Sequence, residues 1–221
     1  MLATSQLVKN IAKCYNEPEI AGTGNRYGIT VTEKEAEAML WDEFLNSDYH
    51  DWRGKGKSED RLEKPGWLAS WCEEHGLAYP GDPSPDELAA LKDLRGKMFR
   101  MVQKITSGAT LSADDLEMLN RTMAGGSVVH LLRSSDEGWR LDTAPAVPDW
   151  RSVLAVIALS FAQTLAEGEA SRIRICDNPD CLWVYYDRTR NRSKRYCDDR
   201  ACGNLMKVRR FRASKKHVDS R

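Results

Sequence analysis

The chain has 221 residues, 41% of them hydrophobic and 30% charged, and its formal net charge at pH 7 is zero. This length permits one or two domains with a sizeable core, and the composition is ordinary for a globular protein with a hydrated surface. The charge is unevenly distributed: residues 172–221 hold 15 Lys and Arg but 6 Asp and Glu, so they carry +9 and the rest carries −9. We therefore expect an acidic body joined to a basic module that contacts a polyanion. Electrostatic attraction between two domains is the alternative.

Neither a secretory signal nor a membrane-spanning segment is expected. The first residues lack a charged region followed by an apolar one. The longest apolar stretch, residues 153–166, is interrupted by Ser160, Gln163 and Thr164. It is shorter than the roughly 18 residues that a spanning helix needs. We expect a buried core helix there, and a cytoplasmic protein that does not bind a membrane.

The first third of the chain gives weak structural signals. Residues 1–36 are predicted to be an extension outside the main domain. A helix is expected at 33–45, because Thr32 and Glu35 have the spacing of a capping box. Residues 48–64 are polar and contain glycines, which predicts a surface loop.

Stronger helical patterns follow. Periodicity, caps and turn residues predict a short helix at 65–76, a long helix at 84–105, a helix at 113–123, a hairpin at 128–133 and 139–142, and a core helix at 149–166. Together these elements predict a mainly α fold, with a helical N-terminal domain at 37–170 that carries a small β-hairpin.

Four of the six cysteines form the pattern Cys-x4-Cys-x15-Cys-x4-Cys, built from Cys176, Cys181, Cys197 and Cys202. Two close pairs joined by a hairpin-sized spacer can place four thiolates on a tetrahedron around Zn²⁺. In a cytoplasmic protein, paired cysteines indicate metal ligands before disulfides. A redox or disulfide role is the alternative.

The residues around the cysteines predict a small finger at 171–213, followed by a basic tail at 214–221. Two short strands are expected at 172–175 and 182–186, and a helix at 204–212. A last ligand at the start of this helix makes the finger treble-clef-like. The helix has one apolar arc, which we expect to pack on the finger or the body; it consists of Leu205, Val208 and Phe211.

Basic side chains concentrate between the cysteine pairs and on the last helix. Arginine offers planar, bidentate donors to phosphate and to guanine edges, so these residues are candidates for nucleic-acid contacts. The candidate set is Arg188, Arg190, Arg192, Lys194, Arg195, Asn204, Lys207, Arg209, Arg210 and Arg212. A merely solvated charged face is the alternative.

The chain resembles the CGNR zinc-finger family, whose members carry an N-terminal ABATE domain. The resemblance lies in the residues 176–181 (CDNPDC), 186–191 (YDRTRN), 194–197 (KRYC) and 202–204 (CGN). The family is named for Cys-Gly-Asn-Arg, whereas this chain has Leu205 in place of the arginine. Residues 43–47 (EFLNS) resemble the Asp-Phe-Val-Asn-Thr motif of the ABATE domain. The resemblance covers about residues 37–213 and implies a bacterial, stress-linked transcriptional regulator.

Three functions follow as hypotheses. The first is a regulator that binds double-stranded DNA, with a body that senses an unidentified small molecule or mediates assembly. The second is an RNA-binding protein, in which Tyr185, Tyr186 and Tyr196 stack on unpaired bases. The third is a protein-interaction adaptor with purely structural zinc. An enzyme is not expected, because four cysteine ligands leave no open zinc position for water.

A ligand pocket in the body is a further hypothesis. The ABATE resemblance places polar groups beside aromatic ones, which makes Asn46, Trp52, Arg53 and Trp67 candidate pocket residues. The alternative is that the tryptophans belong to the core. The sequence has no heptad seam of the kind that forms a coiled-coil dimer.

Overall fold

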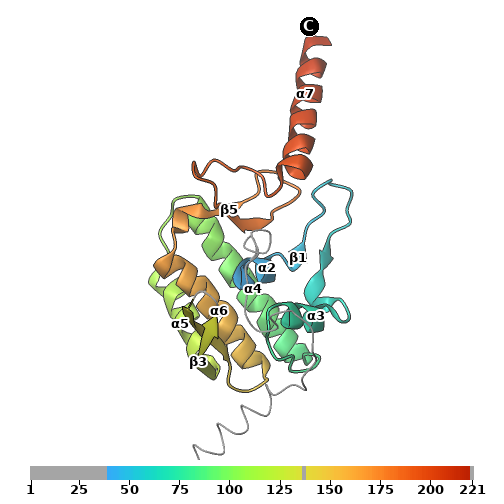
Figure 1. Ribbon diagram of the computed structural model, residues 1–221. Helices are drawn as coiled ribbons and strands as arrows, with labels where there is room; N and C mark the ends of the chain where they lie inside the picture. Colours follow the sequence, from blue (N-terminus) through green and yellow to red (C-terminus); the bar gives the residue numbers. More distant parts are fainter. Residues whose placement is uncertain (1–38, 136–137, 220–221) are drawn as a thin grey trace, which may run out of the picture.

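The computed structural model describes residues 39–135 and 138–219 (Figure 1). The elements of the body are α2 (Leu40–Leu45), β1 (Asp48–Tyr49), β2 (Glu59–Asp60), the 3₁₀ turn η1 (Arg61–Glu63), α3 (Trp67–Glu74), α4 (Pro85–Thr106), α5 (Ala113–Gly125), β3 (Val128–Ser135), β4 (Gly138–Pro145) and α6 (Trp150–Glu167). The finger follows with η2 (Ala170–Arg172), β5 (Ile173–Ile175), β6 (Val184–Tyr186), the π turn η3 (Asp199–Gly203) and α7 (Asn204–Asp219). The mainly α fold with a C-terminal finger is therefore confirmed. The predicted extension at 1–36 and the proposed Thr32 cap lie outside the described residues.

The body is a bundle in which α4, α5 and α6 lie side by side (Figure 1). Capping motifs in the local sequence mark the starts of α4 and α5. The Ser84 hydroxyl accepts a hydrogen bond from the Glu87 N–H and the Glu87 carboxylate accepts one from the Ser84 N–H, which is a capping box. Ser112 and Asp115 form the same motif at α5. Beyond its cap, α4 buries Leu91, Leu94, Met98, Met101 and Val102, which recur at helical spacing.

The short helix α2 occupies the centre of the core. Trp41 and Phe44 are fully buried. The ring centroids of Trp41 and Phe161 are 5.1 Å apart, and the Trp41 indole N–H donates to the Thr164 hydroxyl at 2.9 Å. A buried indole thus has its donor satisfied on α6, as expected for a tryptophan in a core.

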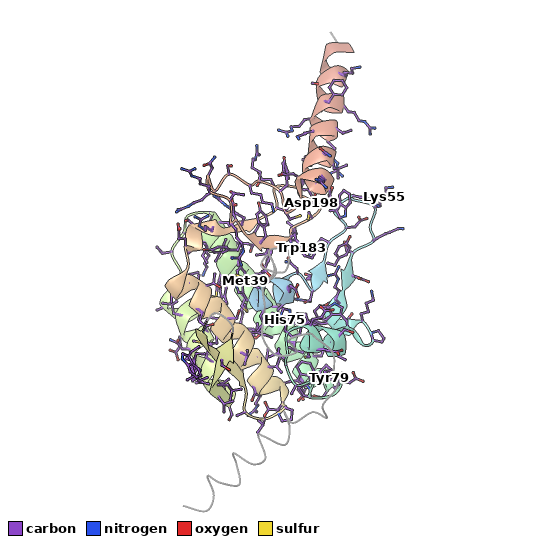
Figure 2. The ribbon with its side chains drawn as sticks, viewed as in Figure 1. Met39, Lys55, His75, Tyr79, Trp183 and Asp198 are labelled. Carbon is purple, nitrogen blue, oxygen red and sulfur yellow. The ribbon has the colours of Figure 1, made fainter. Side chains whose placement is uncertain are left out.

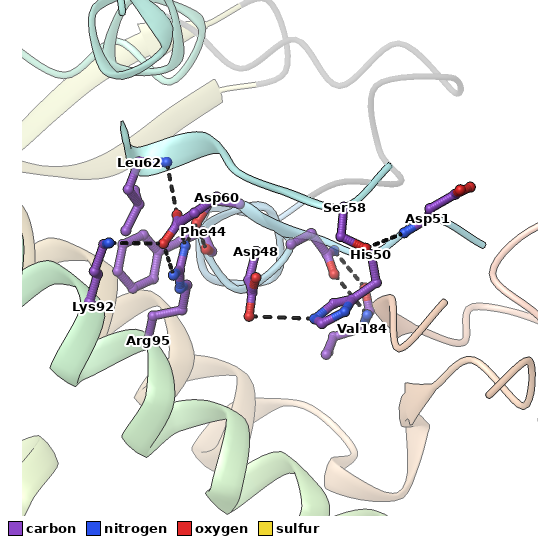
Figure 3. A network of polar contacts seen from close by, with 12 residues as sticks. Phe44, Asp48, His50, Asp51, Ser58, Asp60, Leu62, Lys92, Arg95 and Val184 are labelled. Atoms are coloured by element: carbon purple, nitrogen blue, oxygen red, sulfur yellow. Dashed lines mark hydrogen bonds and ion pairs between the residues drawn. The ribbon is translucent and has the colours of Figure 1, made fainter. Parts of the chain in front are cut away.

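The predicted loop at 48–64 has more structure than the polar sequence suggested. Strands β1 and β2 pair antiparallel, with Asp48 opposite Asp60. The Asp60 carboxylate accepts two hydrogen bonds of 2.7 Å from Arg95 on α4, as Figure 3 shows. Between the strands, the Asp51 carboxylate accepts from the N–H groups of Arg53 and Lys55. These hydrogen bonds to Asp51 and Asp60 explain why residues 48–64 adopt a defined structure although they lack an apolar pattern.

The hairpin β3–β4 is longer than predicted, with eight residues in each strand. In its register Leu132 faces Leu141 and Ser134 faces Trp139. Leu132, Trp139 and Leu141 are all exposed. Backbone pairing extends the strands beyond the short apolar segments from which we predicted them.

The finger sits on the body through its two strands. Ile173 and Val184, on the paired strands β5 and β6, are 1% exposed and belong to the main hydrophobic core. From the finger, α7 projects away from the body (Figure 1). It continues to Asp219, so the described part of the predicted basic tail is helical.

One packing prediction for α7 was wrong. Val208 and Phe211 are 45% and 60% exposed instead of being packed on the finger or the body. Six of the sixteen residues of α7 are Lys or Arg and one is Asp. Packing the apolar arc would also desolvate neighbouring ammonium and guanidinium groups, which is costly.

Candidate metal centre and basic surface

The four cysteines of the finger converge on one point. Their sulfur atoms all lie within 4.8 Å of one another. The sulfur of Cys197 is 3.7 Å from that of Cys181 and 3.8 Å from that of Cys202. Thiolates about 2.3 Å from a tetrahedral zinc ion are about 3.8 Å apart. The residues therefore fit one Zn²⁺ bound by four cysteines.

The first pair of ligands is held by a turn between β5 and β6. The Cys176 N–H donates to the Trp183 carbonyl at 2.9 Å, and the Cys181 N–H donates to the Asn178 carbonyl at 2.9 Å. Leu182 closes the turn in the left-handed region, with φ of 55°. This backbone conformation is unusual for a branched residue and brings the strand back beside Cys176.

The second pair is held by the π turn η3. The Asp198 carboxylate caps this turn by accepting from the N–H groups of Arg200 and Ala201, at 2.6 and 2.7 Å. The cap places Cys202 at the base of α7. Figure 2 shows Asp198 at this base and Trp183 nearer the body. The Asp177 N–H joins the two halves of the site by donating to the Arg195 carbonyl.

The thiols influence one another strongly. Hydrogen bonds from the Cys181 and Cys197 thiols lower the pKa of Cys176 to about 2, whereas donating to Cys176 raises the pKa of Cys181 to about 12. Burial raises the pKa of Cys202. The neighbouring thiols thus oppose one another's ionisation, and a divalent cation bound among them would favour the thiolate form of all four.

Asn178 is a structural residue that sequence reasoning missed. It is fully buried, and its side-chain amide donates to the Cys202 sulfur at 3.4 Å and to the Trp52 carbonyl at 2.8 Å. It therefore connects a metal ligand to the body loop at 51–58. The signal in the sequence was an amide residue between two ligand cysteines, a position that favours bonds to the turn.

Asp187 organises the basic loop that follows β6. It is fully buried, and its carboxylate accepts from the Thr189 N–H and hydroxyl and from the Lys194 N–H. Burial alone would raise the pKa of Asp187, but these hydrogen bonds outweigh it and lower the pKa. Arg172 donates to the carbonyls of Asp187 and Thr189. The loop carrying Arg188 and Arg190 is therefore fixed from inside.

Several predicted nucleic-acid contacts are already paired with acidic residues. Arg195 binds Asp177 at 2.7 Å, and Arg192 binds Glu169. Arg209 binds Asp180 at 2.5 Å and also donates to the Arg53 carbonyl. Gly54 approaches this pair so closely that a Cβ there would lie 2.8 Å from the Asp180 carboxylate. Arg209 therefore fixes the base of α7 against the body.

The other residues predicted to contact nucleic acid are more accessible to such a partner. Arg188 is exposed and lies over the Tyr186 ring at 5.6 Å, and Lys194 lies over the Tyr185 ring. Asn204 and Arg210 are exposed and bond only to carbonyls of their own turns. The remaining three have exposed side chains that form no hydrogen bond or ion pair within residues 39–135 and 138–219: Arg190, Lys207 and Arg212.

The four predicted pocket residues are not gathered around one cavity. Both ends of the Asn46 amide bind Val184 of β6. Trp52 packs beside the metal centre, and the Arg53 guanidinium lies 4.6 Å from its ring. Trp67 stacks on Trp71 in the body. Three of the four residues thus lie where the body meets the finger.

A cavity of about 240 Å³ lies at the same junction. Asn46, Arg95 and His50 border it from the body, and Leu182 borders it from the finger. A second cavity of about 260 Å³ lies between α4, α5 and α6.

Two family models match the chain, and no curated protein does. The ABATE model, described as "Putative stress-induced transcription regulator", matches residues 39–168, and the CGNR zinc finger model matches residues 172–215. Both are regulatory or zinc-finger types. None of the helices in the described part of the chain is long and apolar enough to cross a membrane. Because the first match covers more than half of the sequence and the second covers the cysteine cluster, the chain belongs to the ABATE family and carries a C-terminal CGNR zinc finger.

Proposed function

We propose that this protein is a cytoplasmic transcriptional regulator that binds double-stranded DNA through its zinc finger. The observation that carries the proposal is the basic loop at 188–194, which Asp187 holds by hydrogen bonds to Thr189 and Lys194 and which precedes the metal ligand Cys197. A loop that is ordered before binding loses little conformational freedom when it meets phosphate. Cysteines serving as metal ligands instead of disulfides suit a reducing compartment.

The charge distribution supports a polyanionic partner. Residues 172–221 carry a net charge of +9 against −9 on the rest of the chain. Arg188, Arg190, Lys207 and Arg212 are exposed, and none of them has a carboxylate partner among the described residues. Neutralising phosphates with such groups releases counterions, so affinity should fall steeply with salt.

The tyrosines favour duplex DNA over single-stranded RNA. Tyr185 and Tyr196 are 7% and 8% exposed and pack around the metal centre, so their rings have little surface for stacking on bases. The Tyr186 hydroxyl accepts from the Glu169 N–H, and its ring is covered by Arg188. Base stacking is the usual basis of single-strand recognition.

The metal centre supports a binding role and not a catalytic one. Its four cysteines complete a tetrahedron, whereas a catalytic zinc ion keeps a position open for water. In this proposal the helical body supplies assembly or sensing. The cavity of about 240 Å³ supports sensing, because a small ligand there would touch both Asn46 of the body and Leu182 of the finger.

The test is binding of the zinc-loaded chain to a fluorescent random-sequence duplex across a salt series. We expect a steep negative slope of log affinity against log salt, and loss of binding in Cys197→Ser. Arg190→Ala should reduce the magnitude of the slope by about 0.9, the value for one phosphate contact. Arg121→Ala removes another exposed arginine, on α5, and should leave the slope unchanged.

Each competing function predicts a different result. Negligible duplex binding by a folded, zinc-loaded chain would contradict the proposal and favour the protein-interaction adaptor. Stronger binding to single-stranded RNA than to duplex DNA would favour the RNA-binding hypothesis.

A further inference from the structure

We propose that α7 is the element that reads DNA sequence, and that its outward face enters the major groove and places Val208 and Phe211 against thymine methyl groups. This inference rests on the duplex binding proposed above. It concerns two apolar residues that lie outside the set of basic contacts.

The base of α7 is anchored and the rest of the helix is free. Met206 packs against the cluster around the cysteines, and Arg209 binds Asp180 and the Arg53 carbonyl. Beyond this point the side-chain hydrogen bonds that we find stay within the helix: Arg210 donates to the Met206 carbonyl and Ser214 to the Phe211 carbonyl. Figure 1 shows α7 standing clear of the other elements. Its sixteen residues span about 24 Å. The major groove of DNA is wide enough to admit an α-helix.

The face turned away from the body has a mixed character. Met206 and Arg209 mark the face that contacts the rest of the protein. With 3.6 residues per turn, the opposite face consists of Asn204, Lys207, Val208, Phe211 and Lys215, and all five are exposed. The Lys215 ammonium lies 5.0 Å from the centre of the Phe211 ring. Cations therefore border an apolar strip on this face.

This mixture disfavours a second copy of the chain as the occupant. Two such faces packed together would bring Lys207 and Lys215 near the like charges of the partner helix. α7 has six basic residues and one acidic residue with which to compensate them. A polyanion removes the same repulsion, because phosphates flank the groove on both sides.

The apolar strip further restricts which part of DNA this face can contact. On the floor of the major groove, the apolar group that base pairs present is the C5-methyl of thymine, and phenylalanine is among the side chains that contact it. Asn204, at the base of the same face, has an amide of the kind that pairs with adenine. The outward face of α7 thus fits a groove containing A·T pairs better than it fits phosphate alone.

The experiment replaces thymine by deoxyuracil, which removes the methyl group and leaves the hydrogen-bonding edge intact. Duplexes are first selected from a random-sequence pool with the full zinc-loaded chain, and then synthesised with thymine or deoxyuracil. We expect deoxyuracil to weaken wild-type binding about three- to fivefold for each contacted methyl group. Phe211→Ala and Val208→Ala should weaken binding to the thymine duplex and reduce this discrimination, with an unchanged salt slope. Leu116→Ala, an exposed apolar residue on α5, should retain the discrimination.

Four results would overturn the inference. Equal wild-type affinity for the two duplexes, or a selection that enriches no sequence, would do so while leaving duplex binding intact. A solution dimer that Phe211→Ala dissociates would assign the apolar strip to a second copy. Absence of any duplex binding would overturn the proposed function as well.

Discussion

The side-chain amide of Asn46 binds both main-chain groups of Val184. Its nitrogen donates to the Val184 carbonyl at 2.8 Å, and its oxygen accepts from the Val184 N–H at 2.8 Å. Asn46 ends α2 in the body, whereas Val184 begins β6 in the finger. Both residues are buried, so the amide satisfies the strand edge as a neighbouring strand would.

Asn46→Ala should therefore destabilise the whole chain. The substitution leaves a buried N–H and a buried carbonyl of Val184 without partners, which costs about 2–4 kcal/mol of the free energy of unfolding. Urea denaturation of the zinc-loaded protein measures this loss. Asn120→Ala, at an exposed position on α5, is the matched control and should change stability by about 0.5 kcal/mol or less. Equal stability of the two variants would show that the Asn46–Val184 pair does not hold the finger to the body.

The strands of the finger are expected to contribute to the body core. Ile173 is 1% exposed within the main hydrophobic cluster, whereas Val208 on α7 is 45% exposed. Ile173→Ala should cost about 2–5 kcal/mol and keep a single unfolding transition, because the cavity opens in the shared core. Val208→Ala should leave stability nearly unchanged. A separate, early transition confined to the finger in Ile173→Ala would contradict a shared core.

Local signals in the sequence predicted the parts of the structure that depend on neighbouring residues. The close pairs Cys176/Cys181 and Cys197/Cys202 indicated the metal centre, and Ser112 indicated the start of α5, because caps and ligand pairs act over a few residues. The bonds from Asn46 to Val184 and from Asn178 to Trp52 join positions more than 120 residues apart. No periodicity encodes such partners, so their roles became visible only in the fold.

The apolar arc of α7 shows a different limit. The apolar spacing correctly predicted a helix, but an amphipathic pattern does not determine which part of the protein, if any, covers the apolar side. The hydrogen bonds of Arg209 turn the basal face of α7 toward the finger and leave Phe211 in solvent. The orientation of this helix thus depends in part on contacts of Arg209 with segments that are distant in the sequence.

Asn178→Ala should weaken metal binding without removing a ligand. The substitution deletes the hydrogen bond to the Cys202 sulfur and the bond to the Trp52 carbonyl. Loss of a partner that orients a ligand typically costs 10–100-fold in metal affinity. Competition with a chromogenic zinc chelator measures the change. Asn191→Ala, exposed on the basic loop, should retain the wild-type affinity, and the same result for Asn178→Ala would exclude a role for this amide in holding Cys202.

The carboxyl group of Asp42 should make stability fall as pH rises. Asp42 is 4% exposed on α2, and burial raises its pKa from 3.8 to about 7, although its side chain accepts a hydrogen bond from the Met39 N–H. In the unfolded chain the carboxyl ionises near pH 4. Between about pH 4 and pH 7 the folded state therefore binds more protons than the unfolded state, and each rise in pH favours unfolding. Above pH 7 the penalty is fully present and changes little.

Asp42→Asn isolates this effect, because an amide keeps the acceptor for the Met39 N–H and stays neutral. The free energy of unfolding of the variant minus that of the wild type should be about 2 kcal/mol larger at pH 8 than at pH 5. One pKa unit corresponds to about 1.4 kcal/mol. Taking the difference between the two proteins cancels the titration of groups that they share. Glu74→Gln, an exposed carboxyl-to-amide change on α3, should alter stability little at either pH. A constant difference between wild type and Asp42→Asn across this range would mean that the Asp42 carboxyl is ionised in the folded protein throughout, and that water reaches it beside α2.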